Sequence, residues 1–308
     1  MRKELIGSIT LIAILLAACA HKAPPIFKDR LQPKLAKVSV INNRQLQLTF
    51  TEEIDTMTLA PDSIFITSEQ ETLTVLLTYP SLSASEIIAA TEPMKNVDYE
   101  ISGSVFDKAE NKGIFKSSFK GSSSPDTITP WITSYSQGGN KYEFFLQFSE
   151  AMDTTIVSFA IIPKREFTAT WSNHRYVKFL PTSEDQSMNF DTTYYLFLKS
   201  ARDISGNRVI PFVTSVTPDT SYAPISLSGR ALIDTIPIKS GLALLSRDHV
   251  IGITLVTNGD FLFNVRDSLA HTITVIAQEY SGSIITRPGT ENIVILKKEN
   301  IDIDSLID

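Results

Sequence analysis

An internal repeat limits the folds that this chain of 308 residues can adopt. The segment QLQLTFTEEID at 45–55 matches the segment EFFLQFSEAMD at 143–153, at a separation of 98 positions (143 − 45). In both segments apolar and polar residues alternate, which indicates a β-strand with one buried face. The residues of that face are Leu46, Leu48 and Phe50 in the first copy and Phe144, Leu146 and Phe148 in the second. The chain therefore contains two copies of one β-rich unit.

The far ends of the two copies also correspond. Tyr99 precedes Asp107 by eight residues, Tyr195 precedes Asp203 by eight, and an asparagine follows four positions after each aspartate. The separation here is 96 (203 − 107). We therefore expect the copies to differ in loop length while their strands keep register, with Tyr195 equivalent to Tyr99. A unit of about 100 residues with about seven short strands has the size of an immunoglobulin-like β-sandwich.

One turn position differs between the copies. Gly206 precedes Asn207 in the second copy, whereas Glu110 precedes Asn111 in the first. Glutamate is a poor residue for the positive φ that such a turn often needs. We therefore expect a different turn in the first copy.

The rest of the chain also favours strands. Short β-branched and aromatic runs alternate with clusters of Gly, Pro, Asn, Asp and Ser, and no window indicates a long amphipathic helix. Past a linker at 217–224, the runs ISLSGRAL, LALLS, VIGITLVTNGDFLFNV and HTITVIAQEY predict the strands of a third domain. The pair Asn258 and Gly259 predicts a two-residue hairpin within it.

The N-terminal segment has the layout of a secretory leader. Arg2 and Lys3 precede an apolar run from Leu5 to Ala18, and Cys19, the only cysteine of the chain, follows directly. The run holds 14 residues (18 − 5 + 1), whereas a membrane-spanning helix needs about 20. We therefore expect residues 1–18 to be a cleaved signal peptide rather than a transmembrane anchor.

The tetrad Leu16, Ala17, Ala18 and Cys19 resembles the lipobox of bacterial lipoproteins. The resemblance implies that the Cys19 thiol carries a diacylglycerol and that an acyl chain such as palmitate caps its amine after cleavage. The alternative is a free cysteine behind an ordinary signal peptide. Because exported chains have access to disulfides, a lone cysteine suggests an occupied thiol. Ala20 stands where enteric bacteria place Asp for inner-membrane retention, which favours the outer membrane.

The composition of the mature chain limits the classes of partner that it can bind. The whole chain has a net charge of −6, and removal of the leader, which carries +1, leaves −7 (−6 − 1). Such a surface does not attract nucleic acid or anionic lipid. With 43% hydrophobic and 20% charged residues, the chain can bury the cores of about two or three domains. Residues 19–36, with three prolines, indicate an extended tether, and residues 299–308 an acidic tail.

The repeat resembles a known family. The segments FSEAMD, VKFLP and YYLFLKSARDISGN, each at its place in a strand pattern, resemble the bacterial Ig-like domain named after S-layer proteins, the SbsA-like type. The resemblance covers 37–120 and 130–216, with a linker at 121–129. Residues 225–298 resemble the carboxypeptidase regulatory-like domain through Gly229, residues 243–245 and the hairpin. Both resemblances imply interaction or spacer modules of exported proteins without catalytic residues.

The predicted fold is therefore all-β. Two tandem immunoglobulin-like β-sandwiches are followed by a small transthyretin-like β-sandwich. Every part of the mature chain is expected to have a hydrophobic core, apart from the tether, the linkers and the tail.

Acidic residues recur at both ends of the repeat. They are Glu52, Glu53 and Asp55 in the first copy, Glu150 and Asp153 in the second, and Asp107 and Asp203 at the far turns. Calcium favours clustered oxygens, but no Asp-x-Asp-x-Asp loop occurs, and Asp before Thr suits a turn or cap. We interpret these carboxylates as turn formers and predict no metal and no cofactor, with a calcium site as the alternative.

The sequence carries no catalytic motif. The histidines His21, His174, His249 and His271 lack metal-ligand spacing, and HExxH, GxSxG and phosphate-loop patterns are absent. A triad assembled from scattered residues is the alternative. We predict a non-enzymatic, membrane-anchored scaffold or binding module of the cell envelope, whose partner is an envelope protein or polysaccharide.

Aromatic residues gather in the second copy. They are Trp131, Tyr135, Tyr142, Trp171 and Tyr176. Alternation places most of them in the core, but rings that line a groove can stack on sugars. The alternative function is therefore a surface adhesin or glycan-binding accessory protein that uses Trp131, Tyr135, Trp171 and Tyr176.

Overall fold

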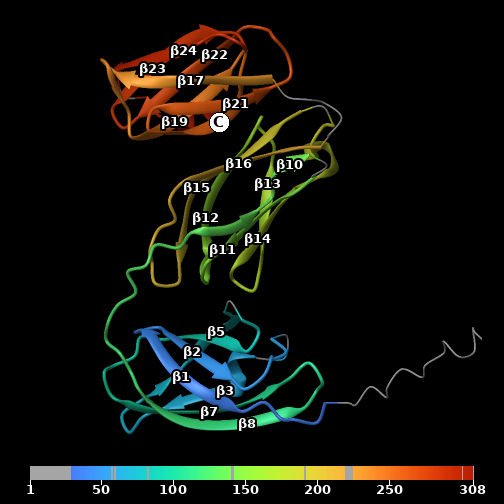
Figure 1. Ribbon diagram of the computed structural model, residues 1–308, viewed down its shortest axis with the longest axis vertical. Helices are drawn as coiled ribbons and strands as arrows, with labels where there is room; N and C mark the ends of the chain where they lie inside the picture. Colours follow the sequence, from blue (N-terminus) through green and yellow to red (C-terminus); the bar gives the residue numbers. More distant parts are fainter. Residues whose placement is uncertain are drawn as a thin grey trace, which may run out of the picture. The chain divides into compact units, whose positions relative to one another are not determined.

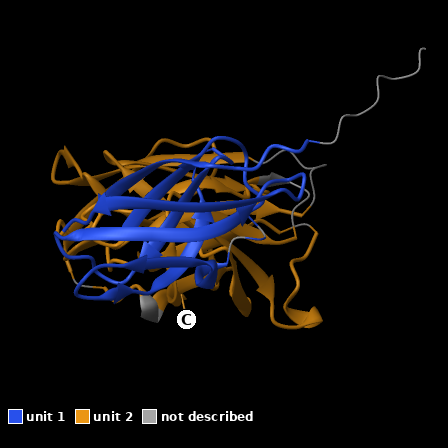
Figure 2. Ribbon diagram, turned by 90° about the horizontal axis from the view of Figure 1, so that it is seen from below, with its two compact units in different colours: residues 1–41, 45–122 blue, residues 42–44, 123–308 orange. Residues whose placement is uncertain are grey.

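The computed structural model describes residues 29–307, apart from 57, 59, 82, 140–141, 191, 219–224 and 300. Strands dominate these ranges, and a four-residue helix, α2 (Asp304–Ile307), comes last. The chain divides into two compact units, residues 1–41 with 45–122 and residues 42–44 with 123–308 (Figure 2). The predicted all-β class is confirmed. Cys19 and its leader lie outside the described residues.

The first domain is a sandwich of two four-stranded sheets, ordered β1-β2-β6-β5 and β4-β3-β7-β8. These orders match the A-B-E-D and C-F-G sheets of immunoglobulin domains, with one strand added beside C. Its strands (Figure 1) are β1 (Leu35–Asn42), β2 (Gln45–Phe50), β3 (Ile64–Thr67), β4 (Thr72–Leu73), β5 (Val75–Pro80), β6 (Glu86–Thr91), β7 (Asp98–Phe106) and β8 (Lys112–Lys120). The alternation of β2 is confirmed, because Leu46, Leu48 and Phe50 are all buried.

The second domain repeats this plan with sheets ordered β13-β14-β11-β9 and β10-β16-β15-β12. The short strand β10 pairs in parallel with β16, as a second segment of the first strand does in variable-type domains. Its strands are β9 (Ile132–Tyr135), β10 (Gly138–Gly139), β11 (Phe144–Phe148), β12 (Met152–Ile162), β13 (Phe167–Ser172), β14 (Tyr176–Pro181), β15 (Tyr194–Asp203) and β16 (Phe212–Thr217). Phe144, Leu146 and Phe148 are buried in its core, as the repeat predicts.

A buried tyrosine opens the sixth main strand of each sandwich. The Tyr99 hydroxyl accepts a hydrogen bond from the Lys95 amide at 3.0 Å, and the Tyr194 hydroxyl accepts one from the Asn189 amide at 3.1 Å. This is the tyrosine corner of immunoglobulin-like domains. The structural equivalent of Tyr99 is therefore Tyr194, and the expectation that Tyr195 matches it is wrong.

A β-bulge in β15 explains that one-residue error. Ser158 pairs with Ser200 and Phe159 pairs with Leu198, which leaves Lys199 as the extra residue. The residues of β15 that pack into the sandwich core are Tyr194, Leu196 and Leu198 before the bulge and Ala201 after it. Because one inserted residue reverses the two faces of a strand, sequence spacing alone misaligns everything before the bulge.

The turns that follow β7 and β15 are the same, although a different turn was expected in the first domain. Glu110 has φ of 67° and Gly206 has φ of 94°. In each turn the residue at this position donates its amide to the carbonyl of the preceding aspartate, at 3.2 Å for Glu110 and 3.1 Å for Gly206. Surrounding hydrogen bonds thus hold glutamate in a conformation that favours glycine.

Exchanging these two residue types tests that strain. A Cβ added at Gly206 meets no heavy atom within 4 Å, so Gly206→Ala should cost about 1 kcal/mol through the backbone alone. Glu110→Gly should be neutral or stabilise by less than about 1 kcal/mol. Calorimetry of the two variants would show the difference, and an unchanged melting temperature for Gly206→Ala would contradict it.

The third domain is a single sheet ordered β18-β17-β21-β20-β19-β22-β23-β24, which closes because β17 also pairs in parallel with β24. Leu227, Phe263 and Ile273 are among the residues packed inside it. Its strands are β17 (Ile225–Ile233), β18 (Ile236–Pro237), β19 (Ser240–Ser246), β20 (Val250–Thr257), β21 (Asp260–Val265), β22 (His271–Ala277), β23 (Tyr280–Thr286) and β24 (Asn292–Lys298).

The predicted Asn-Gly hairpin is confirmed in this third domain. Thr257 pairs with Asp260, and the two residues between them have positive φ, 53° for Asn258 and 88° for Gly259. Positive φ at both central positions is the requirement of a type I′ turn, which asparagine and glycine meet at low cost.

An apolar seam joins the second and third domains within the second unit. The side chains of Tyr195 and Phe197 project from the outer face of β15. They pack against Leu242, Leu244 and Ile253 of the third domain. The Tyr195 hydroxyl also donates to the Asn264 carbonyl at 3.3 Å. The C-terminal segment closes over the same cluster, with Ile307 buried in it. The two domains therefore share a hydrophobic core in addition to their own.

Truncation in the seam should separate the unfolding of these domains. Phe197 is 4% exposed, and replacing a buried Phe by a small residue costs about 3 kcal/mol or more. In calorimetry we expect the single transition of the second unit to split in Phe197→Ser. Phe145→Ser, on the opposite sheet, is the control and should lower stability without splitting. A single transition in Phe197→Ser would contradict the coupling.

Candidate functional site

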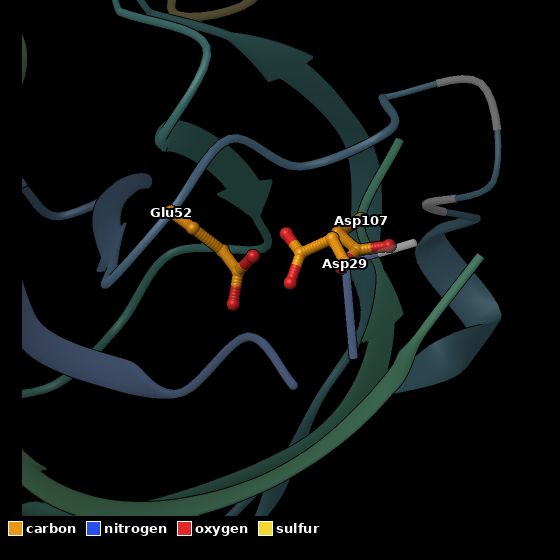
Figure 3. A group of neighbouring side chains, drawn as sticks. All are labelled: Asp29, Glu52 and Asp107. Carbon is orange, nitrogen blue, oxygen red and sulfur yellow. The ribbon is translucent and has the colours of Figure 1, made fainter. Parts of the chain in front are cut away.

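Three carboxylates meet at one end of the first domain. Asp29 precedes β1, Glu52 follows β2 and Asp107 follows β7. One carboxylate oxygen of each lies within 4.8 Å of the others. Figure 3 shows the Glu52 carboxylate directed toward those of Asp29 and Asp107. Asp107 is buried, Glu52 is half-buried and Asp29 is exposed. We call this group the first acidic cluster.

The second domain repeats the arrangement. Asp126, Glu150 and Asp203 offer oxygens within 4.8 Å of one another. Each corresponds to a member of the first cluster, at separations of 97, 98 and 96 positions (126 − 29, 150 − 52 and 203 − 107). We call this group the second acidic cluster. The match between the two clusters is complete, whereas the acidic residues that stand out in the sequence, Glu52, Glu53 and Asp55 against Glu150 and Asp153, match only in part.

The aspartate after the sixth strand holds the turn in both domains. Asp107 Oδ1 accepts from the amides of Ala109 and Asn111 at 2.8 and 2.7 Å, and its Oδ2 accepts from the Asn111 side chain at 2.7 Å. Asp203 makes the same three bonds, with Ser205 and Asn207, each at 2.8 Å. These bonds use most of the acceptor capacity of a carboxylate.

The same asparagine also holds the segment that leads into each sandwich. Asn111 Nδ2 donates to the Asp29 carbonyl at 3.2 Å, and Asn207 Nδ2 donates to the Asp126 carbonyl at 3.3 Å. Asp29 lies in the predicted tether and Asp126 in the predicted linker, and the sequence did not identify either of them as a member of a carboxylate cluster. A signal was present, because each aspartate lies four residues before a proline, Pro33 or Pro130.

The charges of the first acidic cluster act against one another. Burial, with the negative charges of Asp107 and Asp29, raises the pKa of Glu52. For Asp107, burial works in the same direction but is outweighed by the hydrogen bonds from Asn111 and Ala109, so its pKa is lowered. The turn aspartate therefore keeps its charge, and Glu52 takes up a proton more readily than Asp107 does.

The three carboxylates fall short of a calcium shell. Calcium takes about six to eight oxygen ligands, and the aspartate at the centre already accepts three hydrogen bonds in each domain. The arrangement is therefore suited first to closing a turn and fastening the incoming chain.

The four aromatic residues proposed for glycan contact do not share one surface. Trp171 and Tyr135 lie on the two edge strands of one sheet. Trp171, which pairs with Val177, packs against the core, whereas Tyr135, which pairs with Leu146, is 38% exposed. Trp171 stacks on Phe148, with 5.7 Å between ring centroids. Of the other two, Trp131, which precedes β9, is 58% exposed. Tyr176 stacks on Phe145 on the outer face of the sheet, with 5.5 Å between the ring centroids.

The solved structures that resemble this chain do so at low sequence identity. No known family and no curated protein matches this sequence. The S-layer protein rSbsC is 11% identical over 85% of this chain and 41% of its own, with a TM-score of 0.31. The N-terminal part of the bacterial S-layer protein SbsC is 14% identical over 60% and 44%, with a TM-score of 0.28. This chain spans less than half of either S-layer protein.

A third solved structure is SGBP-B of the Bacteroides ovatus mixed-linkage glucan utilization locus, bound to a mixed-linkage heptasaccharide. It is 12% identical over 80% of this chain and 68% of its own, with a TM-score of 0.22. In the part of the chain that the structure describes, no helix is long and apolar enough to cross a membrane.

Calcium should leave the stability of both sandwiches unchanged. A site with Kd of about 10 μM would add about 2.7 kcal/mol in about 1 mM calcium, which is several degrees in a melt. We expect no such shift when the full chain is melted in calcium and in chelator. A shift that disappears in Glu52→Gln or Glu150→Gln would instead assign a calcium site to the acidic clusters.

Proposed function

We propose that this chain is an exported bacterial lipoprotein, anchored through Cys19 and acting as a non-catalytic scaffold or binding module of the cell envelope. The observation that carries the proposal is the leader. A basic head, a 14-residue apolar run (18 − 5 + 1) and small residues end directly at the only cysteine. Burial of an acyl chain contributes about 0.8 kcal/mol per methylene, so two or three chains on one residue anchor a protein firmly.

The build of the mature chain supports a scaffold. Two tandem sandwiches and a closed β-domain present large surfaces, and the apolar seam around Tyr195 and Phe197 fastens the last two together. The best-buried carboxylates, Asp107 and Asp203, serve turns rather than chemistry. An all-β chain of this kind suits the display of a binding surface at a distance from the membrane.

An outer-membrane position with an envelope protein or polysaccharide as partner completes the proposal. Ala20 beside the anchor residue favours release from the inner membrane, and the net charge of −7 after leader removal (−6 − 1) disfavours anionic surfaces.

Adhesion or glycan binding by the second domain is the alternative function. It needs aromatic rings on one accessible surface. Trp171 packs against the core of its sandwich, so the alternative is left with the exposed Trp131 and Tyr135 and with Tyr176 beside Phe145. The scaffold is the function that the geometry supports better.

Replacing the anchor residue tests the proposal. Cys19→Ser should abolish incorporation of an alkyne fatty acid and move the protein from the detergent phase to the aqueous phase, because the thiol that carries the lipid is gone. Ala20→Ser is the matched control and should keep both the label and the detergent partitioning. Unchanged labelling of Cys19→Ser would show that the protein is not lipidated there.

A further inference from the structure

A cavity of about 410 Å³ lies where the second and third domains meet, within the second compact unit. The second domain contributes residues after β12 and the start of β15, and the third contributes residues between the end of β21 and the start of β22. The Tyr195 hydroxyl connects the two sides, since it donates to the Asn264 carbonyl at 3.3 Å. Tyr195 also belongs to the apolar seam. We call the seam and this cavity together the domain interface.

A buried imidazole lies in the third-domain side of this interface. His271, the first residue of β22, lines the cavity but is only 2% exposed. Both ring nitrogens are buried, and neither has a hydrogen-bond partner among the described residues. A positive charge on this ring would therefore lose its hydration without gaining a hydrogen bond in return. Burial of a charge under those conditions is costly.

The carboxylate beside the ring is already engaged by other donors. Asp267 Oδ1 lies 3.3 Å from His271 Nε2, but the two are not aligned for a hydrogen bond. Arg247 Nη2 donates to both oxygens of Asp267, at 3.0 and 2.9 Å, and the Leu269 amide donates to Oδ1 at 3.0 Å. Because the guanidinium neutralises the carboxylate, Asp267 offsets only part of the cost of charging the ring.

The other titratable side chains around the cavity are basic. Arg165 lines it from the second domain, and His249 and Arg266 line it from the third. Arg165 acts electrostatically on Asp185, an acidic residue outside the lining, and His249 is exposed to solvent. A basic side chain does not stabilise a second positive charge. The lining therefore adds no carboxylate besides Asp267 that could pair with a protonated His271.

These surroundings make the folded chain take up a proton less readily than the unfolded chain. Burial, the largest influence, lowers the pKa of His271, Arg247 acts in the same direction and Asp267 opposes them. In an unfolded chain the pKa of histidine is about 6.5. Between the two values the unfolded chain binds more protons, so stability rises with pH there. The contribution is complete above about pH 6.5 and is lost as the pH falls toward the folded pKa.

We propose that the domain interface is pH-sensitive and loosens in acid, when His271 takes up a proton. The charged ring needs water, and the cavity that it lines is the space through which water enters. Hydration displaces the segment between Asn264 and His271, which weakens the bond from Tyr195 and opens the seam behind it. This inference goes beyond the scaffold function and does not depend on Cys19, because it concerns how firmly two domains of the mature chain are held together.

Scanning calorimetry of the full-length chain at about pH 7.5 and about pH 5.5 tests the energetics. One proton bound by the unfolded chain alone changes the unfolding equilibrium up to about tenfold per pH unit, or about 3 °C in a unit of this size. We expect the melting temperature of the second unit to fall by that much more in the wild type than in His271→Gln, which cannot titrate. His249→Gln, exposed on the same cavity, is the matched control and should keep the wild-type pH dependence. An equal fall in His271→Gln would overturn the proposal.

Hydroxyl-radical footprinting separates a looser interface from an unstable third domain, because it reports the exposure of single side chains. Tyr195 and Phe197, now 6% and 4% exposed, should be oxidised at least about twofold more at about pH 5.5 than at about pH 7.5. Phe263, in the core of the third domain, should stay protected. In His271→Gln the oxidation of all three should be independent of pH. Oxidation that rises at Phe263 as well would assign the effect to unfolding of the third domain, and no rise at Tyr195 and Phe197 would likewise contradict a loosened interface.

Discussion

Burial of both faces of strand β15 is the constraint on which the second compact unit depends. Tyr194, Leu196 and Leu198 fill the sandwich core, while Tyr195 and Phe197 enter the seam with the third domain. A strand buried on both faces appears in sequence as a continuous apolar run, and YYLFL is such a run. Burial of each large apolar side chain of this kind contributes about 1.5–3 kcal/mol to the free energy of unfolding. Without the third domain, the outer face of β15 would be exposed.

The two ends of β15 have different chemistry because the strand separates them. At its end, Asp203 closes the turn and joins Asp126 and Glu150 in the second acidic cluster. At its start, Tyr194 and Tyr195 border a cavity of about 410 Å³ between the second and third domains. A ten-residue strand spans about 30 Å, so the second acidic cluster lies several Debye lengths from this cavity at physiological salt.

The repeated turns show how hydrogen bonds override a local preference. Glu110 takes a positive φ that Gly206 takes freely, because the carboxylate of Asp107 accepts two amides and one side chain around the turn. The same asparagine fastens the incoming chain in both domains. The turn is thus a joint between a sandwich and the segment before it, which explains why it is built alike in both copies.

The sequence by itself determined what depends on short spacings. Alternation defined the strands at 45–50 and 144–148, the repeat defined two like domains, and Asn258 with Gly259 defined a hairpin, because period and turn preference act over a few residues. Only the tertiary structure decided that Tyr194 rather than Tyr195 is the corner tyrosine, since a bulge at Lys199 shifts the register. It likewise decided that Asp29 and Asp126 join the acidic clusters and that Arg165 and His271 line one cavity. Those groupings depend on which faces and loops meet in space, and nothing in the local sequence specifies that meeting.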